Sequence, residues 1–162
     1  MINSHSLRSP KWQIPVLMAL AVLFLAVCFI RRSGSPQSEL SSDTHGYYIY
    51  LPTIFIQGDV HAMSREHFQG QCFNQQGEAF TKYTCGNAYF YFPFFIAAHA
   101  YAKASGLPAT GYSAPYCYAI MICGVFWAFA GLILLLWLLL RYFSVPVSWL
   151  AMLAVMFGTN YF

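Results

Sequence analysis

The feature that most constrains this chain is a run of hydrophobic residues without any charge, from Tyr118 to Leu140. As a helix, these 23 residues would measure roughly 34 Å, enough to cross the hydrocarbon core of a bilayer. Arg141 follows directly and ends the run. The pattern predicts a transmembrane helix over 118–140.

A second such run extends from Trp12 to Ile30, with Lys11 before it and Arg31 and Arg32 after it. Its 19 residues would span roughly 28 Å. The alternative is a cleaved signal peptide, but the run is long for one, and arginines follow it where small residues of a cleavage site would stand. We therefore expect a membrane anchor over 12–30.

Composition agrees with a membrane protein and excludes several other classes. Hydrophobic residues make up 59% of the 162 residues and charged residues only 8%, against roughly 25% in soluble domains. The net charge is +3, and like charges never cluster beyond the pair Arg31 and Arg32, so nothing predicts binding to nucleic acid. The five cysteines form no C-x-x-C pair, which excludes a zinc ribbon or a thioredoxin-type motif.

Two further hydrophobic segments make the expected fold an all-α membrane protein of three to four transmembrane helices. Residues 88–102 include Pro93 and His99 and are short for a crossing, so they predict a transmembrane or re-entrant helix. A loop over 103–117 follows, rich in glycine and proline. Residues 145–162 are still apolar where the sequence stops, which predicts a truncated transmembrane helix and a larger helix bundle.

The polar loop over 31–87 contains all five acidic residues: Glu39, Asp43, Asp59, Glu66 and Glu78. Within it, the apolar segment 47–56 is too short to cross a membrane, and it predicts a short interfacial helix. The basic residues on either side of the first helix balance, so charge does not set the orientation. The acidic content and a disulfide between Cys72 and Cys85 would favour an exported loop, while two unrelated thiols are the alternative.

The densest group of reactive residue types is the segment 41–52, which includes Asp43 and His45. A carboxylate at the membrane border could accept a proton from a hydroxyl group or help to hold a divalent cation, the one cofactor we consider. The alternative, which the residue type favours, is that Asp43 caps the following short helix. His61, Glu66 and His67 could join a metal site, but no zinc-binding spacing is present, and a metal-free loop is the simpler interpretation.

Other residues also allow two interpretations. His99 lies in an apolar helix, where an ionisable group is often functional, yet it could equally be an interfacial histidine with a satisfied hydrogen bond. The aromatic stretches 83–95 and 112–118 are typical of interfacial belts, or of rings that stack on a sugar or an isoprenoid chain.

The order of these segments resembles the N-terminal part of the GT-C membrane glycosyltransferases, especially bacterial, Bacteroidetes-like members. The resemblance covers nearly the whole chain and rests on a first helix followed by short motifs: 43–52 (DTHGYYIYLP), 82–86 (KYTCG), 92–99 (FPFFIAAH), 111–116 (GYSAPY) and 157–160 (FGTN).

The resemblance implies a multi-helix enzyme of the bacterial inner membrane that transfers a sugar from a polyprenyl-phosphate carrier to an extracytoplasmic acceptor. Asp43 matches the family's catalytic acidic residue. Thr44 stands where the family often has a second one, so a single carboxylate base is implied rather than a metal site. The implied substrate-binding residues are His45, Tyr47, Tyr48, Tyr50, Lys82 and Tyr83.

In this family the residues that grip the lipid phosphate lie further along the chain, so we expect residues 1–162 alone to be inactive. The alternatives to an enzyme are a non-catalytic multi-pass membrane protein, either a transporter fragment or a scaffold, and an inactive truncated gene product. Transporters of the inverted-repeat kind gather polar residues at the middle of the membrane, whereas here they gather in a loop. That difference favours chemistry at the membrane surface.

Overall fold

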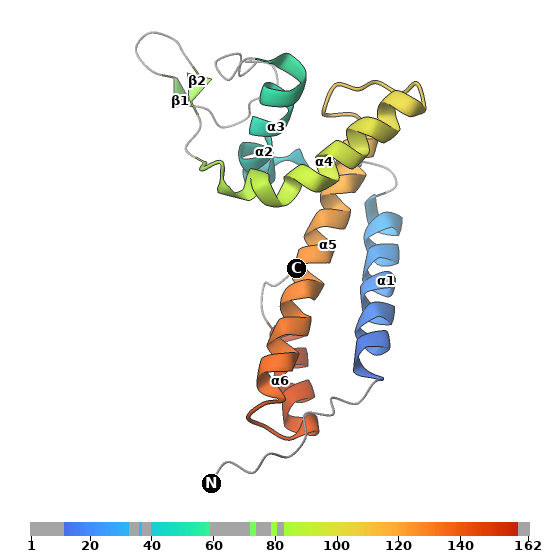
Figure 1. Cartoon of the computed structure of the whole chain (residues 1–162), viewed down its shortest axis with the longest axis vertical. Coiled ribbons are helices and arrows are strands. Elements are labelled where there is room, and N and C mark those ends of the chain that lie inside the picture. Colours follow the sequence, from blue (N-terminus) through green and yellow to red (C-terminus); the bar gives the residue numbers. More distant parts are fainter. Residues whose placement is uncertain are drawn as a thin grey trace. The chain divides into compact units, whose positions relative to one another are not determined.

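The computed structural model describes residues 12–32, 36, 40–58, 72–73, 79–80 and 83–158 (Figure 1). They form helices and one small pair of strands. In chain order the elements are α1 (Gln13–Arg32), α2 (Ser42–Tyr48), α3 (Tyr50–Pro52), the π-helix η2 (Thr53–Gln57), β1 (Cys72–Phe73), β2 (Ala79–Phe80), α4 (Gly86–Ala104), α5 (Ala114–Leu139) and α6 (Val145–Gly158). The predicted all-helical character is confirmed, and the two-residue antiparallel pair β1–β2 is the addition to it.

The chain divides into two compact units, and α5 continues from one into the other. The terminal unit comprises Met1–Cys28 and Gly124–Phe162, and the central unit comprises Phe29–Cys123. Each unit has an apolar core of its own.

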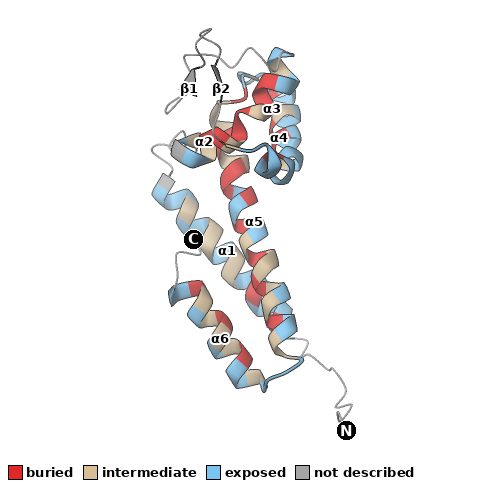
Figure 2. Cartoon of the chain, turned by 90° about the vertical axis from the view of Figure 1, so that its left-hand side faces the viewer, coloured by how far each residue is buried: buried red, intermediate tan, exposed pale blue. Residues whose placement is uncertain are grey.

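In the terminal unit, α1, the second part of α5, and α6 pack together through aliphatic, methionine and aromatic side chains. Leu17 of α1, Leu132 of α5 and Met152 of α6 are almost fully buried in this core. Outside the core, many large apolar side chains face outward, and Figure 2 shows much of α1 exposed. Exposed apolar surface of this extent is expected where lipid, not water, surrounds a helix.

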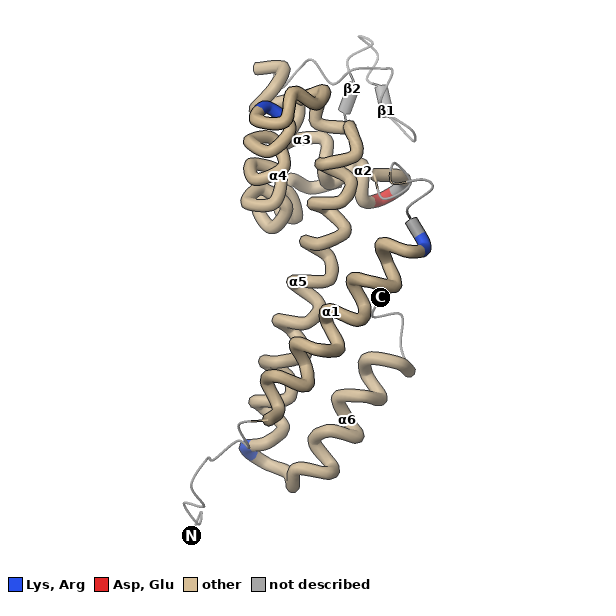
Figure 3. Tube along the Cα trace, turned by 90° about the vertical axis from the view of Figure 1, so that its right-hand side faces the viewer, with Lys and Arg blue, Asp and Glu red and all other residues tan. Residues whose placement is uncertain are grey.

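Two helices of the described residues are long and apolar enough to cross a bilayer: α1 over Gln13–Arg31 and α5 over Ala114–Leu139. Figure 3 shows that charged residues stand near the ends of these helices and not along them. They coincide with the predicted crossings 12–30 and 118–140. The other two predicted crossings stay predictions, because α4 does not reach this apolarity and α6, over Val145–Gly158, is shorter.

The central unit is built on aromatic packing between α2, α4 and the first turns of α5. Tyr48, Phe95 and Tyr116 are fully buried, one from each of these helices. The ring of Phe95 lies with its centroid 6.0 Å from that of Tyr48 and 5.5 Å from that of Tyr116. These contacts hold α4 across the start of α5, as Figure 1 shows.

The predicted interfacial segment 47–56 folds as three short pieces, α2, α3 and η2, rather than as one helix. Pro52 has no N–H to donate, and the backbone continues past it into the wider turns of η2. Gly58 ends η2 with a positive φ of 73°, which glycine adopts without strain.

Candidate functional site

Asp43 lies in the first turn of α2, one residue after the helix begins. The capping residue is Ser41, so the interpretation of Asp43 as the helix cap is wrong. The carboxylate instead accepts a hydrogen bond at Oδ1 from the hydroxyl of Tyr83, at 2.5 Å. Asp43 is exposed, so a dissolved molecule can reach a carboxylate whose orientation Tyr83 sets.

Gly46 makes this hydrogen bond possible. A Cβ atom at this position would stand 2.0–2.7 Å from three carbons of the Tyr83 ring, closer than real side chains approach. Without a side chain, α2 lets the ring lie against its backbone. On its other side, the Tyr83 ring meets Tyr47 edge-on, with centroids 4.9 Å apart.

Tyr50 provides a further contact to the same residue. Its hydroxyl donates to the backbone carbonyl of Tyr83 at 2.5 Å. Burial raises the pKa of the Tyr50 hydroxyl above its ordinary value, so it stays protonated and able to donate. Tyr83 is therefore held through its hydroxyl, its ring and its backbone by residues of α2 and α3.

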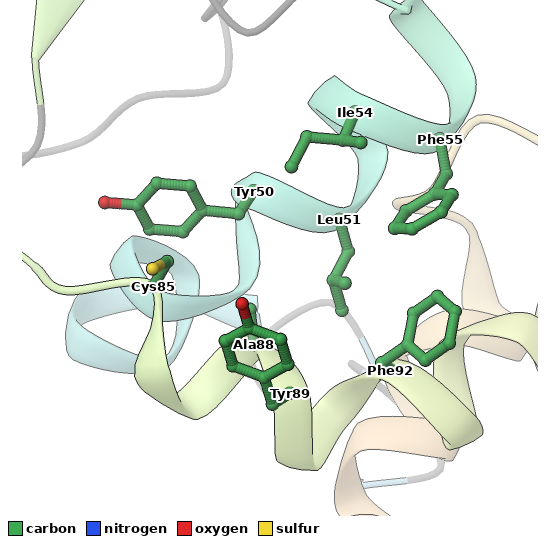
Figure 4. Close-up of a pocket in the computed structure, with 8 residues that line it drawn as sticks. All are labelled: Tyr50, Leu51, Ile54, Phe55, Cys85, Ala88, Tyr89 and Phe92. Carbon is green, nitrogen blue, oxygen red and sulfur yellow. The ribbon is translucent and has the colours of Figure 1, made fainter.

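Beside this cluster lies an apolar pocket of about 360 Å³ between α3–η2 and the start of α4 (Figure 4). Tyr50 and Cys85 form its border with the Tyr83 segment, and the rings of Phe55 and Phe92 face each other at 5.0 Å on another side. Its lining residues are Tyr50, Leu51, Ile54, Phe55, Cys85, Ala88, Tyr89 and Phe92. Such a lining suits the apolar part of a ligand.

Two predicted substrate-binding residues, Tyr48 and His45, lie in the interior of the central unit. The Tyr48 hydroxyl donates to the Gly111 carbonyl at 2.5 Å, and burial raises its pKa well above the ordinary value. His45 is 7% exposed, and its ring lies 5.7 Å from that of Tyr112. Both side chains pack the loop before α5 against α2, and their contact with a substrate stays a prediction.

His99 has a hydrogen-bond partner in the structure, as one of its two interpretations expects. Its Nδ1 atom lies 2.6 Å from the hydroxyl oxygen of Tyr116, and the Phe95 ring stacks on it at 6.0 Å. This pair belongs to the contact between α4 and α5.

The metal and disulfide predictions fall largely outside the described residues. Lys82, His61, Glu66 and His67 are not described, and within the described part of the chain no group of three or more His, Cys, Asp or Glu could hold a metal ion. A divalent cation stays a prediction. Cys85 is an exposed free thiol, and the side chain of Cys72 is not described.

Of the predicted site residues, Asp43, Tyr47 and Tyr50 each contact Tyr83. Their part in catalysis or substrate binding, and that of His45, Tyr48 and Lys82, stays a prediction.

The sequence interpretation missed Gly46 and the apolar pocket. A glycine within a helical segment was the available signal for Gly46. No local signal indicates the pocket, because its walls come from two segments that lie 30 or more residues apart in the sequence. No family model, curated protein or solved structure matches the chain.

Proposed function

We propose that this chain is part of a GT-C type glycosyltransferase of the bacterial inner membrane, which transfers a sugar from a polyprenyl-phosphate carrier to an acceptor hydroxyl. The observation that carries the proposal is the exposed carboxylate of Asp43, oriented by Tyr83 beside an apolar pocket. This arrangement joins a group that can take a proton with a surface that can receive a lipid.

In the proposed reaction Asp43 is the general base. The acceptor hydroxyl oxygen attacks the anomeric carbon of the sugar, while its proton passes to the Asp43 carboxylate. The bond between that carbon and the phosphate oxygen breaks, and the polyprenyl phosphate leaves with the bonding electrons. Tyr83 is a positioning residue, because its hydroxyl occupies Oδ1 and leaves Oδ2 for the incoming proton.

The apolar pocket is the proposed contact for the first isoprenoid units of the carrier. Tyr50 links the two parts of the site, because its ring lines the pocket while its hydroxyl binds the Tyr83 backbone. A lipid seated against Phe55 and Phe92 would thus place its phosphate end near the aromatic cluster around Asp43.

Location at a membrane border supports the proposal as well. The last residues of α1 and the first turns of α5 belong to the central unit, so this unit includes an end of each candidate span. The exposed apolar residues of η2 and α4 include Phe55, Tyr89 and Ile96, which suit the interfacial region of a bilayer. We propose that this border faces the extracytoplasmic side.

The test is sugar transfer by membranes that contain the complete gene product. The probes are radiolabelled polyprenyl-phosphate mannose and polyprenyl-phosphate aminoarabinose, offered with a cell-envelope extract as acceptor. Asp43→Asn should lower the transfer rate by about 10² to 10⁴-fold, the range for removal of a general base. Asp59→Asn, the same change elsewhere in the loop, is the matched control and should keep the rate.

Tyr83→Phe separates positioning from proton transfer. It leaves the carboxylate in place and removes only the hydroxyl that orients it, so we expect a smaller loss than for Asp43→Asn. Full activity of Asp43→Asn at a normal membrane level would refute the base assignment. If the unaltered protein transfers sugar from neither of the two donors, the result would instead favour a non-catalytic membrane protein.

A further inference from the structure

A polar pair lies where α4 packs against the start of α5, in the central unit, and it uses none of the proposed catalytic residues. The Nδ1 atom of His99 is 2.6 Å from the hydroxyl oxygen of Tyr116. His99 is half-buried, whereas Tyr116 is fully buried. The Tyr116 hydroxyl therefore depends on groups of the protein, and not on water, for its hydrogen bonds.

Gly111 determines the direction of the bond between His99 and Tyr116. Its backbone N–H donates to the Tyr116 hydroxyl oxygen, while its carbonyl accepts from the Tyr48 hydroxyl. The Tyr116 oxygen is thus already an acceptor, and its single proton needs an acceptor of its own. Among the described residues the partner that can accept this proton is His99, through Nδ1. His99 is therefore neutral, with its own proton on Nε2.

Protonation of His99 would reverse this hydrogen bond. A charged imidazole has a proton on both nitrogen atoms, so Nδ1 becomes a donor. The Tyr116 hydroxyl could then only accept, and its own proton would be left buried without a partner. A buried donor without an acceptor is strongly unfavourable, so this contact between α4 and α5 favours the neutral histidine.

The charges around His99 act in the same direction. Burial, and after it the positive charge of Lys103 one helical turn further along α4, lower the pKa of His99 below its ordinary value of about 6.5. From α5 the ring faces the hydroxyl of Tyr116. Asp43, the one acidic residue that the structure describes, binds Tyr83 instead. No carboxylate of the described residues therefore stabilises a charged His99.

We infer that His99 is a pH-sensitive latch between α4 and the start of α5, which holds when the imidazole is neutral and opens when it is protonated. Because the folded chain favours the neutral form, the contribution of the latch to the free energy of unfolding is complete above about pH 6.5 and is lost as the pH falls below this value. The inference rests on the packing of the central unit and not on the proposed sugar transfer.

Opening of the latch would also affect the apolar pocket. Phe95 stacks on the His99 ring, with centroids 6.0 Å apart, and its ring lies 6.2 Å from that of Phe55 in the pocket wall. Gly111 connects the latch to Tyr48 of α2. Acid pH should therefore loosen α4 from α5 and from the segments that line the pocket.

The experiment is equilibrium unfolding of the complete gene product by sodium dodecyl sulfate in mixed micelles, followed by circular dichroism over the range in which histidine changes charge, about pH 7.5 to about pH 5. For the unaltered protein we expect the equilibrium constant for unfolding to rise by about 5- to 30-fold over this range, as one unsatisfied buried donor would cause. His99→Asn places an amide oxygen, which does not titrate, near the position of Nδ1. It should keep the bond to Tyr116 and remove most of the pH dependence.

Tyr116→Phe separates the latch from the simple burial of a histidine. It leaves His99 able to titrate and removes the hydroxyl whose proton would lose its acceptor. We expect this variant to be less stable at every pH, because the Gly111 N–H loses its acceptor, and to depend less on pH than the unaltered protein. Lys103→Gln, at an exposed position, should also weaken the pH dependence, because the repulsion is gone.

The thiols of Cys117 and Cys123 report directly on opening, in a background with Cys28, Cys72 and Cys85 replaced by serine. Both thiols are buried, and that of Cys123 donates to the Phe90 carbonyl of α4. At the acid end of the range they should react with dithiodipyridine faster in this background than when His99→Asn is added. At the neutral end the two rates should be equal.

Four results would overturn the inference. An unfolding constant of the unaltered protein that stays the same over the range would show that no latch opens. An unchanged profile in His99→Asn or in Tyr116→Phe would assign the pH dependence to other groups. Loss of the pH dependence in His67→Asn, and not in His99→Asn, would make another histidine the sensor. Equal thiol reactivity with and without His99→Asn at acid pH would show that α4 stays in place.

Discussion

Replacing Gly46 by alanine should destabilise the central unit, although the same change inside a helix is usually favourable. Alanine in place of glycine ordinarily stabilises a helix by about 0.5–1 kcal/mol. Here the new Cβ would stand 2.0 Å from a ring carbon of Tyr83, so the ring must move. Overpacking of this kind costs about 1–3 kcal/mol, and we add about 0.5 kcal/mol for the exposed hydrogen bond to Asp43, the low end for a typical bond. The balance is a net loss of about 0.5–3 kcal/mol.

The assay is equilibrium unfolding by sodium dodecyl sulfate in mixed micelles, followed by circular dichroism. Gly86→Ala, where a Cβ would meet nothing within 4 Å, is the matched control and should be neutral or slightly stabilising. In a Tyr83→Ala background the cost of Gly46→Ala should disappear, because the clashing ring is gone. The reasoning is refuted if Gly46→Ala is equally destabilising in that background.

Two further changes test the core of the central unit. Gly111→Ala should lower the free energy of unfolding by about 2–4 kcal/mol, because φ at this position is 88° and the new Cβ would stand 2.7 Å from Cβ of Pro52. Gly106→Ala is the matched control, with a φ of 65° but no atom within 4 Å of the new Cβ. It should cost about 1–2 kcal/mol in the same assay. Equal costs would exclude the clash with Pro52. Burial raises the pKa of Tyr112 to about 12. The buried neutral hydroxyl therefore makes its full contribution to the free energy of unfolding below about pH 10, and this contribution is lost as the pH rises from 10 to 12. Alkaline unfolding of Tyr112→Phe should therefore show a weaker loss over this range, and an unchanged profile would contradict that linkage.

The two candidate spans could be predicted from the sequence because the signal is local. Uncharged runs over 12–30 and 118–140 already set the length of α1 and α5 to within a few residues. The helix α4 was also predicted close to its bounds, but whether it crosses the membrane depends on its packing against other helices. Its contact with Tyr116 through Phe95 lies 21 residues away along the chain and has no local signature.

The hydrogen-bond partner of Asp43 could not be predicted from the residues around it. An aspartate at the start of a short helix is a common cap, and neighbouring residues alone favour that reading. The partner that decides, Tyr83, lies 40 residues further along the chain. The Tyr83 ring can approach α2 only because Gly46 has no side chain, and this requirement is visible only once the ring is seen to lie against Gly46.

The central claim is that Asp43 and its surroundings face the extracytoplasmic side of a membrane that α1 and α5 cross. The most direct measurement is labelling of intact cells with a membrane-impermeant maleimide, with cysteine at the exposed position Gln57 and with Cys72 and Cys85 replaced by serine. With α1 and α5 as the two crossings and α4 at the membrane border, a second reporter at Ser144, after α5, marks the opposite side. The account predicts that Gln57→Cys is labelled in intact cells and Ser144→Cys only after lysis, and the reverse pattern would contradict it.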